Sequence, residues 1–256
     1  MRFVLLGNPV AHSLSPRLHN AALAAAGIAG TYSARRVDAS AFHAAVAELR
    51  SGKLTGANVT MPHKARAHAA ADRHDAAAAA AGAVNTLFMT GDGLMGCNTD
   101  VTGVRRVWAD AGFPDRGPVL VLGAGGAAAG VLVALRDHDL CITARNPDAA
   151  ARLLDRIGVA AEIVPWGEGR PAVVINATPL GMAGEGLPPG IMDAAGGFID
   201  LAYGPTPTPA VAEARRRLLP AVDGIGVLIA QAAAAFELWT GKPAPVDAMR
   251  GAVAAA

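Results

Sequence analysis

Lys64 and Asp100 are the residues whose types and surroundings best suit them to transfer a proton. Lys64 ends the segment Asn58-Val-Thr-Met-Pro-His-Lys64, and Asp100 ends Gly96-Cys-Asn-Thr-Asp100. A lysine ammonium can donate to a substrate oxygen and stabilise negative charge there, while a carboxylate can accept from a hydroxyl and keep the lysine aligned. The sequence leaves open which of the two is the formal acid or base. Each also has a plainer interpretation, a solvated helix residue for Lys64 and a helix N-cap for Asp100.

A glycine-rich segment supplies the second half of a redox site. Gly123-Ala-Gly-Gly-Ala-Ala128 follows an apolar run at 119–122, as in dinucleotide-binding loops. Gly123 allows the turn, Gly125 lets the backbone approach a pyrophosphate, and the small Ala128 lets the helix pack on the sheet. Tight packing in an alanine-rich chain is the alternative explanation. The loop residues expected to contact the cofactor are Gly123, Ala124, Gly125, Gly126 and Ala127.

Arg145 indicates which dinucleotide is bound. About twenty residues beyond such a loop, an NAD site usually has an acidic side chain for the ribose hydroxyl. The corresponding strand here ends Thr143-Ala-Arg145-Asn146. A guanidinium pairs with a 2′-phosphate, whereas an aspartate would repel it, so Arg145 favours NADP over NAD. A surface arginine is the alternative, and Arg152 on the next helix is a candidate to assist.

Several polar side chains suit a ligand with hydroxyl groups and a carboxylate. Ser13 and Ser15 flank Leu14, so in an extended segment both hydroxyls point the same way. Asn85 and Gln231 each interrupt an apolar stretch, where an amide needs a partner. The plainer interpretations are a helix cap for Ser15 and a buried helix–helix bond for Gln231. The expected ligand contacts from these patterns are Ser13, Ser15, Asn58, Thr60, Asn85 and Gln231.

Composition excludes several other classes of function. A net charge of +1 gives no support for nucleic acid or an anionic membrane as partner, and no run of strongly apolar residues is long enough for a spanning helix. The basic cluster at 215–217 is expected to be a solvated helix face. No metal site is expected, because the seven histidines lack metal spacing and are interpreted as surface or loop residues. Cys97 and Cys141 form no CxxC pair, which favours a reduced cytoplasmic protein.

The first part of the chain predicts alternating strands and helices. Residues 3–6 form an expected strand, and Ser15 is the expected N-cap of a helix through residue 26, with Pro16 at its first position. Further helices are expected at 40–49, from Pro62 onward through Lys64, and at 76–81. Residues 57–61 are expected to be extended. The segments 84–89 and 93–97 predict a hairpin.

The middle of the chain predicts a doubly wound α/β unit. Continuous apolar runs at 119–122, 140–143, 173–175 and 197–200 are typical of buried parallel strands. Loops are expected at 184–189 and 203–209, and a long helix at 227–239. The predicted fold class is therefore α/β with two domains. An N-terminal substrate domain, 1–100 completed by 224–256, accompanies a Rossmann-type NADP domain at 101–223, with ligands in the cleft between them.

The order of these motifs resembles the shikimate dehydrogenase family along nearly the whole chain. Each motif is short, but eight in order are very specific. They lie at 7–16, 56–64, 82–86, 98–100, 123–127, 176–182, 200–209 and 231–239.

The resemblance implies reversible NADP-linked oxidation of shikimate to 3-dehydroshikimate in the route to aromatic amino acids. Lys64 and Asp100 would be the catalytic pair, and the two serines would bind the substrate carboxylate. Ser15 bears on specificity, because quinate-preferring relatives often have threonine there. Tyr203 would contact the ring hydroxyls or the carboxylate of the substrate. Thr178, on a loop beside the nicotinamide, and Val227 would contact the cofactor.

Three positions depart from the family pattern, and several alternatives stay open. Ala149 stands where the family has a second basic residue, so the preference for NADP is expected to be weaker than usual. Val227 replaces a usual methionine, and Pro179 a common serine. A quinate or aminoshikimate dehydrogenase, and a non-catalytic NADP-binding module, are the alternatives. The paired serines argue against methylene-tetrahydrofolate dehydrogenase, and monomer and homodimer both remain open.

Overall fold

A computed structural model of the chain describes residues 1–204 and 206–254, which divide into two compact units. The first combines residues 1–102 with the chain from Ile229 onward, and the second is residues 103–228. The predicted domain boundaries were after Asp100 and before residue 224. The observed boundaries fall inside helices α5 (Thr99–Asp110) and α9 (Gly224–Thr240), so each of these helices has residues in both units.

The first unit is built on a mixed sheet with the strand order β2-β1-β3-β5-β6-β4. β1 pairs in parallel with β2 and β3, whereas β5 is antiparallel to β3 and β6, which confirms the predicted hairpin. The register places Asn58 of β3 opposite Thr86 of β5. The strands are β1 (Arg2–Gly7), β2 (Thr31–Arg36), β3 (Gly56–Val59), β4 (Arg73–His74), β5 (Thr86–Thr90) and β6 (Gly93–Cys97).

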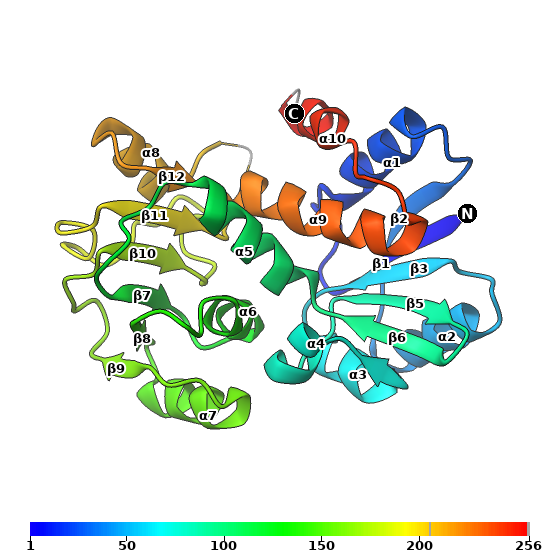
Figure 1. Cartoon of the computed structure of the whole chain (residues 1–256), viewed down its shortest axis with the longest axis horizontal. Coiled ribbons are helices and arrows are strands. Elements are labelled where there is room, and N and C mark those ends of the chain that lie inside the picture. The colour runs from blue at the N-terminus through cyan, green and yellow to red at the C-terminus, as the bar shows by residue number, and fades with distance from the viewer. Residues whose placement is uncertain (205, 255–256) are drawn as a thin grey trace. The chain divides into compact units, whose positions relative to one another are not determined.

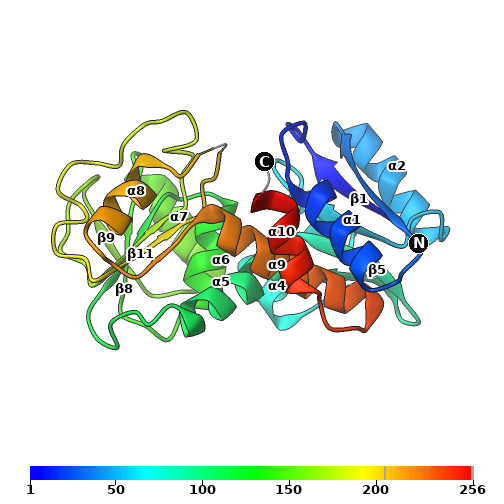
Figure 2. The same ribbon diagram turned by 90° about the horizontal axis from the view of Figure 1, so that it is seen from above.

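The helices of this unit begin and end where local chemistry favours it. Asp38 and Asp75 cap α2 and α4 by accepting from the backbone N–H groups of Ala41 and Ala78. Gly82 ends α4 with φ of 57°. Helix α10 packs beside α1 (Figure 2). The helices are α1 (Ser15–Ala25), α2 (Ala39–Arg50), α3 (Lys64–Ala70), α4 (Ala76–Ala81) and α10 (Val246–Ala254).

Trp239 of α9 is partly buried against residues of the first unit. Its indole stacks on Phe3, with ring centroids 4.8 Å apart, and its Nε1–H donates to the Leu87 carbonyl at 3.3 Å. A Cβ at Gly56 would lie 2.5 Å from this indole, so only glycine fits there. The return of the C-terminal chain to the first unit, predicted from the sequence, is confirmed.

Two predicted helix starts are wrong. α1 has Leu14, not Ser15, as its N-cap, because the Leu18 N–H already donates to the Leu14 carbonyl at 3.1 Å. α3 begins at Lys64, not at Pro62. The backbone first turns around the cis Met61–Pro62 peptide, where the His63 N–H donates to the Thr60 carbonyl at 2.9 Å.

The prediction that all seven histidines lie on the surface or in loops is also wrong. His19 is buried on α1, where its ring stacks on Tyr32 with centroids 4.3 Å apart. His63 does lie in a loop, before α3, but it is buried, its Nε2 lies 2.9 Å from the Val37 carbonyl, and its ring stacks on Phe42. An imidazole face packs as an aromatic surface, so a histidine among apolar residues can be a core residue. His74 lies on the short strand β4 and not in a loop.

The second unit is the predicted doubly wound fold (Figure 1). Its sheet has the order β12-β11-β10-β7-β8-β9, all parallel, which is the Rossmann order. The continuous apolar runs form its buried central strands. The elements are β7 (Val119–Leu122), α6 (Gly126–Ala134), β8 (Leu140–Thr143), α7 (Pro147–Ile157), β9 (Glu162–Val164), β10 (Val173–Asn176), β11 (Gly197–Asp200), α8 (Pro209–Arg216) and β12 (Ala221–Val222).

None of the helices in the described part of the chain has the length and apolar character needed to cross a bilayer.

His19 predicts an acid-sensitive core. Burial lowers its pKa from 6.5 to about 3, and a side-chain hydrogen bond with Asn58 opposes the shift. Below about pH 6.5 the unfolded chain binds a proton that the folded chain excludes, so this contribution to stability is lost as pH falls, by up to about 1.4 kcal/mol per pH unit. His19→Phe keeps an aromatic ring and removes the titration. We expect its melting temperature to fall less than that of the parent between about pH 7 and about pH 5.

The other titrating groups are the same in both proteins, so the difference between the two melting curves isolates His19. Parallel loss of stability in parent and variant would contradict the assignment.

Candidate functional site

The Lys64 ammonium and the Asp100 carboxylate are in direct contact. Lys64 Nζ lies 2.5 Å from Asp100 Oδ2, and the side chains remain 21% and 23% exposed. Lys64 is the first residue of α3, and Asp100 lies in the first turn of α5, where the helix dipole favours a carboxylate. Asn98 Oδ1 accepts from the Val101 N–H at 3.3 Å, so Asn98 caps this turn. The alternative interpretation of Asp100 as an N-cap is therefore wrong.

Asn85 holds the second oxygen of Asp100. Its Nδ2 donates to Asp100 Oδ1 at 2.9 Å, and its Oδ1 accepts from the backbone N–H of Thr99 at 2.7 Å. The side chain is 3% exposed, as expected for an amide among apolar neighbours. Asn85 therefore fixes the carboxylate that faces Lys64.

Asn58 lies behind Asn85 in the same network. Its Nδ2 donates to the Asn85 carbonyl at 3.2 Å and to Thr86 Oγ1 at 3.0 Å. Its Oδ1 accepts from the Tyr32 hydroxyl at 2.8 Å. Both N–H groups of this predicted ligand contact are thus committed to the protein.

Gln231 reaches the network from α9. Its Oε1 lies 3.4 Å from Thr99 Oγ1, which in turn lies 3.1 Å from Asn85 Oδ1. Four predicted site residues therefore belong to one network of contacts, which reaches Lys64 through Asp100. They are Asn58, Asn85, Asp100 and Gln231.

The two serine hydroxyls meet, but not for the predicted reason. Ser13 Oγ and Ser15 Oγ lie 3.2 Å apart, although Leu14 between them is helical in φ and ψ and not extended. The Ser15 N–H donates to Ser13 Oγ at 3.2 Å, which is a local turn of the kind serines favour. Thr60 follows β3 directly, and its N–H donates to the Leu6 carbonyl at 2.9 Å.

In the second unit, the glycine loop leaves the backbone open at the N-terminus of α6. Gly123 has φ of 109°, and a Cβ there would lie 3.0 Å from the Ala177 carbonyl oxygen. Gly125 is the extended N-cap of α6 and has no side chain to occupy the helix N-terminus. A Cβ at Gly125 or Gly126 would meet nothing within 4 Å, so the backbone there is open to approach. Ala128 is fully buried where α6 packs on the sheet.

Arg145 lies in the loop between β8 and α7 and is exposed. The next residue, Asn146, caps α7 by accepting from the Ala149 N–H at 3.2 Å. Arg152 is exposed on α7, two turns into the helix. These positions leave both guanidinium groups accessible to an anion.

A buried carboxylate orders the two loops that carry Thr178 and Tyr203. Asp200 Oδ1 accepts from Asn176 Nδ2 at 2.8 Å, and Oδ2 accepts from the Thr208 hydroxyl at 2.6 Å. Asn176 Oδ1 accepts from the N–H and the hydroxyl of Thr178 at 3.0 and 2.6 Å. Tyr203 follows Asp200 by three residues. The Thr178 loop and the Tyr203 loop therefore share one anchor.

Val227 is 7% exposed in the first turn of α9. Its N–H donates to the Asp223 carbonyl at 3.2 Å. It belongs to the second unit, as do Tyr203 and the glycine loop.

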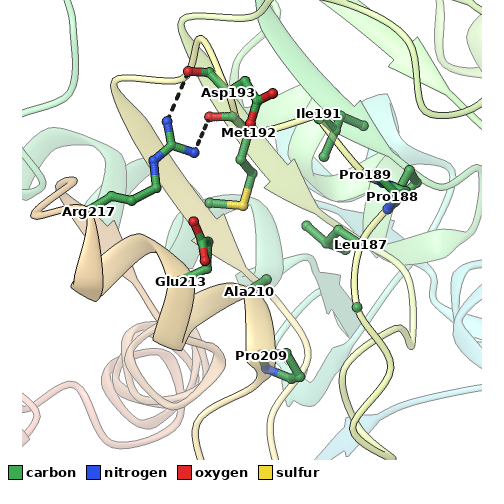
Figure 3. A pocket seen from close by; sticks show the side chains of 12 residues that line it. Leu187, Pro188, Pro189, Ile191, Met192, Asp193, Pro209, Ala210, Glu213 and Arg217 are labelled. Carbon is green, nitrogen blue, oxygen red and sulfur yellow. Dashed lines mark hydrogen bonds between the residues drawn. The ribbon is translucent and has the colours of Figure 1, made fainter.

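A hollow elsewhere on the second unit contains none of the predicted site residues (Figure 3). It lies between the loop at 186–193 and helix α8. Arg217 closes one side by donating to the carbonyls of Met192 and Asp193 at 2.7 and 2.9 Å. The prediction of a solvated face at 215–217 is therefore wrong for Arg217, the C-cap of α8, which donates to backbone oxygens of the 186–193 loop.

Sequence reasoning assigned no role to Thr86, Thr99 or Asp200. Thr86 begins β5 beside Asn85, Thr99 begins α5 beside Asp100, and Asp200 ends the buried strand β11. A second polar group beside a buried amide is the signal that would have found them, because buried polar groups require partners. Across residues 1–204 and 206–254, no three His, Cys, Asp or Glu side chains gather as a metal site would need.

Asp200 predicts a stability that depends on pH in an unusual direction. Burial raises its pKa, against the lowering effect of its hydrogen bonds with Thr208, Ala202 and Asn176. A raised folded pKa means that folding favours the protonated form, so this contribution to stability is present in acid and lost as pH rises through that pKa. Asp200→Asn resembles the protonated form and can donate to Thr208. We expect the stability of the variant relative to the parent to increase from about pH 4 to about pH 7, measured by thermal melting.

A stability difference that does not change with pH would contradict this assignment. Asp193→Asn, on an exposed loop of the same unit, is the matched control.

Comparisons with known proteins agree with the motif resemblance. Residues 5–87 match the shikimate dehydrogenase substrate binding domain, and residues 224–254 the shikimate 5'-dehydrogenase C-terminal domain. A shikimate dehydrogenase (NADP(+)) of Acidiphilium cryptum is 43% identical, covering 98% of this chain and 95% of its own. Among solved structures, shikimate 5-dehydrogenase from Thermus thermophilus with NADP(H) and shikimate has a TM-score of 0.90 at 36% identity, covering 100% and 99% of the two chains. The Listeria monocytogenes enzyme with shikimate and NAD has a TM-score of 0.86 at 31% identity, covering 98% and 95%. The chain belongs to the shikimate dehydrogenase family.

Proposed function

We propose that this chain catalyses the reversible oxidation of shikimate to 3-dehydroshikimate with NADP. The observation that carries the proposal is the contact between Lys64 Nζ and Asp100 Oδ2 at 2.5 Å, which is partly enclosed by protein and still accessible. Relatives named as NADP(+)-dependent shikimate dehydrogenases cover nearly the whole chain. The enzyme would thus serve the shikimate pathway to aromatic amino acids.

The reaction removes a hydride from a ring carbon and a proton from the hydroxyl on that carbon. When bound, NADP supplies the hydride acceptor. The protein must take up the hydroxyl proton, and in the reverse direction return it to the carbonyl oxygen. Lys64 and Asp100 together hold this proton, with general acid–base assistance of about 10²- to 10⁴-fold.

Substrate contacts are proposed at the polar side chains that the sequence singled out. The serine hydroxyls, 3.2 Å apart, suit a carboxylate, which accepts from two donors. The remaining side chains suit ring hydroxyls or the carboxylate. The proposed substrate contacts are Ser13, Ser15, Asn58, Thr60, Asn85, Tyr203 and Gln231.

Cofactor contacts are proposed in the second unit. The open backbone at Gly125 and Gly126 suits the pyrophosphate, and Arg145 suits the 2′-phosphate of NADP. Thr178 and Val227 are proposed beside the nicotinamide. The loop contacts are Gly123, Ala124, Gly125, Gly126 and Ala127.

Steady-state assays test the catalytic pair. We expect the parent protein to reduce NADP with shikimate, and Lys64→Ala to lower kcat by about 10²- to 10⁴-fold while it still folds and binds NADP. The ammonium is lost but the cofactor contacts are unchanged. Lys242→Ala, at an exposed lysine, is the matched control and is expected to have parent activity.

No turnover by the folded parent protein would overturn the proposed function. Retention of activity by Lys64→Ala would remove the lysine from the mechanism. Quinate and aminoshikimate assayed alongside identify the related dehydrogenases, because kcat/KM reports the preference in the transition state. We expect shikimate to have the highest value, given serine and not threonine at position 15.

Arg145 predicts the cofactor preference. A guanidinium–phosphate contact contributes on the order of 1.5–3 kcal/mol, so Arg145→Ala is expected to raise the KM for NADP about tenfold or more. The KM for NAD should change little, because NAD lacks the 2′-phosphate. Arg152→Ala, on the following helix, tests whether the second arginine assists.

An equal rise in both KM values would show that Arg145 does not select the 2′-phosphate. The parent's ratio of kcat/KM values for NADP and NAD gives the strength of the preference with Ala149, where the family has a second basic residue. NAD is a realistic competitor, since the Listeria relative was crystallised with it.

The proposed surroundings are a reducing compartment, the cytoplasm, with small molecules and not nucleic acid or membrane as partners. Support comes from the free thiols of Cys97 and Cys141 and from the net charge of +1.

A further inference from the structure

Two threonine hydroxyls lie inside the polar network behind the lysine–aspartate pair. Thr86 is 0% and Thr99 is 1% exposed. Their Oγ1 atoms lie 3.2 Å apart, and each lies within hydrogen-bond distance of Asn85 Oδ1, at 3.0 and 3.1 Å. Neither side chain reaches solvent, so any effect on a ligand must pass through its neighbours.

Backbone groups fix the orientation of both asparagines. The Thr99 N–H can only donate, so the atom of Asn85 that faces it at 2.7 Å is the oxygen, and Nδ2 must face Asp100. In the same way the Asn85 carbonyl can only accept, which makes Asn58 Nδ2 the donor at 3.2 Å. Neither amide can rotate without losing a backbone partner.

These orientations set the direction of the Thr86 hydroxyl. Asn58 Nδ2 donates to Thr86 Oγ1 at 3.0 Å, so Thr86 is an acceptor there. Its single hydrogen must then go to Asn85 Oδ1 or to Thr99 Oγ1. The hydrogen bonds run in one direction, from Asn58 through Thr86 and Asn85 to Asp100.

The direction matters at the carboxylate. Because Asn85 Nδ2 donates to Asp100 Oδ1, that oxygen must remain an acceptor, and a proton there would face an N–H group. A proton held by Asp100 therefore belongs on Oδ2, the oxygen that contacts Lys64 Nζ. One path is left for a proton shared between the two groups.

We propose that Thr86 is a positioning residue of this enzyme, which holds Asn85 so that Asp100 exchanges a proton only through the oxygen facing Lys64. The inference rests on the proposed function. Substitution of Thr86 tests the role better than substitution of Thr99. The backbone N–H of Thr99 donates to Asn85 Oδ1 whatever side chain stands at position 99.

Thr86→Val tests the role with little change of shape. Valine removes the hydroxyl and places a methyl group where Asn58 and Asn85 have their partner, so both amides must shift. We expect kcat to fall about tenfold to a hundredfold, the scale of a small misplacement at a reacting centre. The KM for NADP should be unchanged, and the solvent deuterium isotope effect on kcat should rise, because proton transfer becomes slower.

Matched variants separate positioning from general destabilisation. Thr86→Ser restores the hydroxyl and is expected to recover most of kcat and the parent isotope effect. Thr90→Val removes a threonine hydroxyl from the same strand, where it donates to the Gly93 carbonyl, and should retain parent kinetics. If Thr86→Val does not fold, Thr86→Ala removes the hydroxyl without the added methyl contact.

The outcomes distinguish this inference from the proposed function. An inactive but folded parent protein overturns the proposed function. An active parent, with Thr86→Val or Thr86→Ala as active as Thr90→Val, overturns the positioning role alone. A loss of kcat that Thr86→Ser does not recover also overturns it, because the hydroxyl would then not be the group responsible.

Discussion

The contact between the Lys64 ammonium and the Asp100 carboxylate is the interaction around which the polar network of the first unit is arranged. Two opposite charges 2.5 Å apart attract strongly only where water is partly excluded, and both side chains are about a fifth exposed. Full burial of the two charges would impose a desolvation cost, and full exposure would leave both side chains flexible. The intermediate setting keeps the pair together and leaves both groups accessible.

Strand register builds the support behind this pair. Asn58 faces Thr86 across β3 and β5, and Thr86 faces Cys97 across β5 and β6. A slip of one residue in either ladder would turn the threonine to the other face of the sheet and leave the amides without partners. The apolar residues that fix the register, Leu87 and Leu94 among them, therefore also fix the polar network.

In the second unit, a single buried carboxylate holds the loops that carry proposed ligand contacts. Asp200 ends a fully buried strand and joins the loops of Thr178 and Tyr203 through Asn176 and Thr208. Its hydrogen bonds offset the cost of burying it, although burial still raises its pKa. In both units, buried polar side chains hold the segments that carry proposed ligand contacts.

The sequence alone determined much of this protein. The hydrophobic pattern and the turn residues between segments predicted the parallel strands of the second unit, the β5–β6 hairpin and the alanine helix α4. These elements depend on local residue choice and on continuous burial. Motif order predicted the family. Local rules failed at Ser15 and Pro62, where a turn stabilised by neighbouring backbone groups shifted the start of the helix.

Tertiary structure decided what each polar residue contacts. Nothing in the spacing of Thr86, Asn58 and Asp100 shows that they join one chain of hydrogen bonds, because that depends on strand register and on where α5 begins. His19 and Arg217 resemble surface residues in sequence, yet one is buried against Tyr32 and the other binds backbone carbonyls. The sequence specifies which groups are able to form hydrogen bonds, whereas their partners are set by packing between segments far apart in the chain.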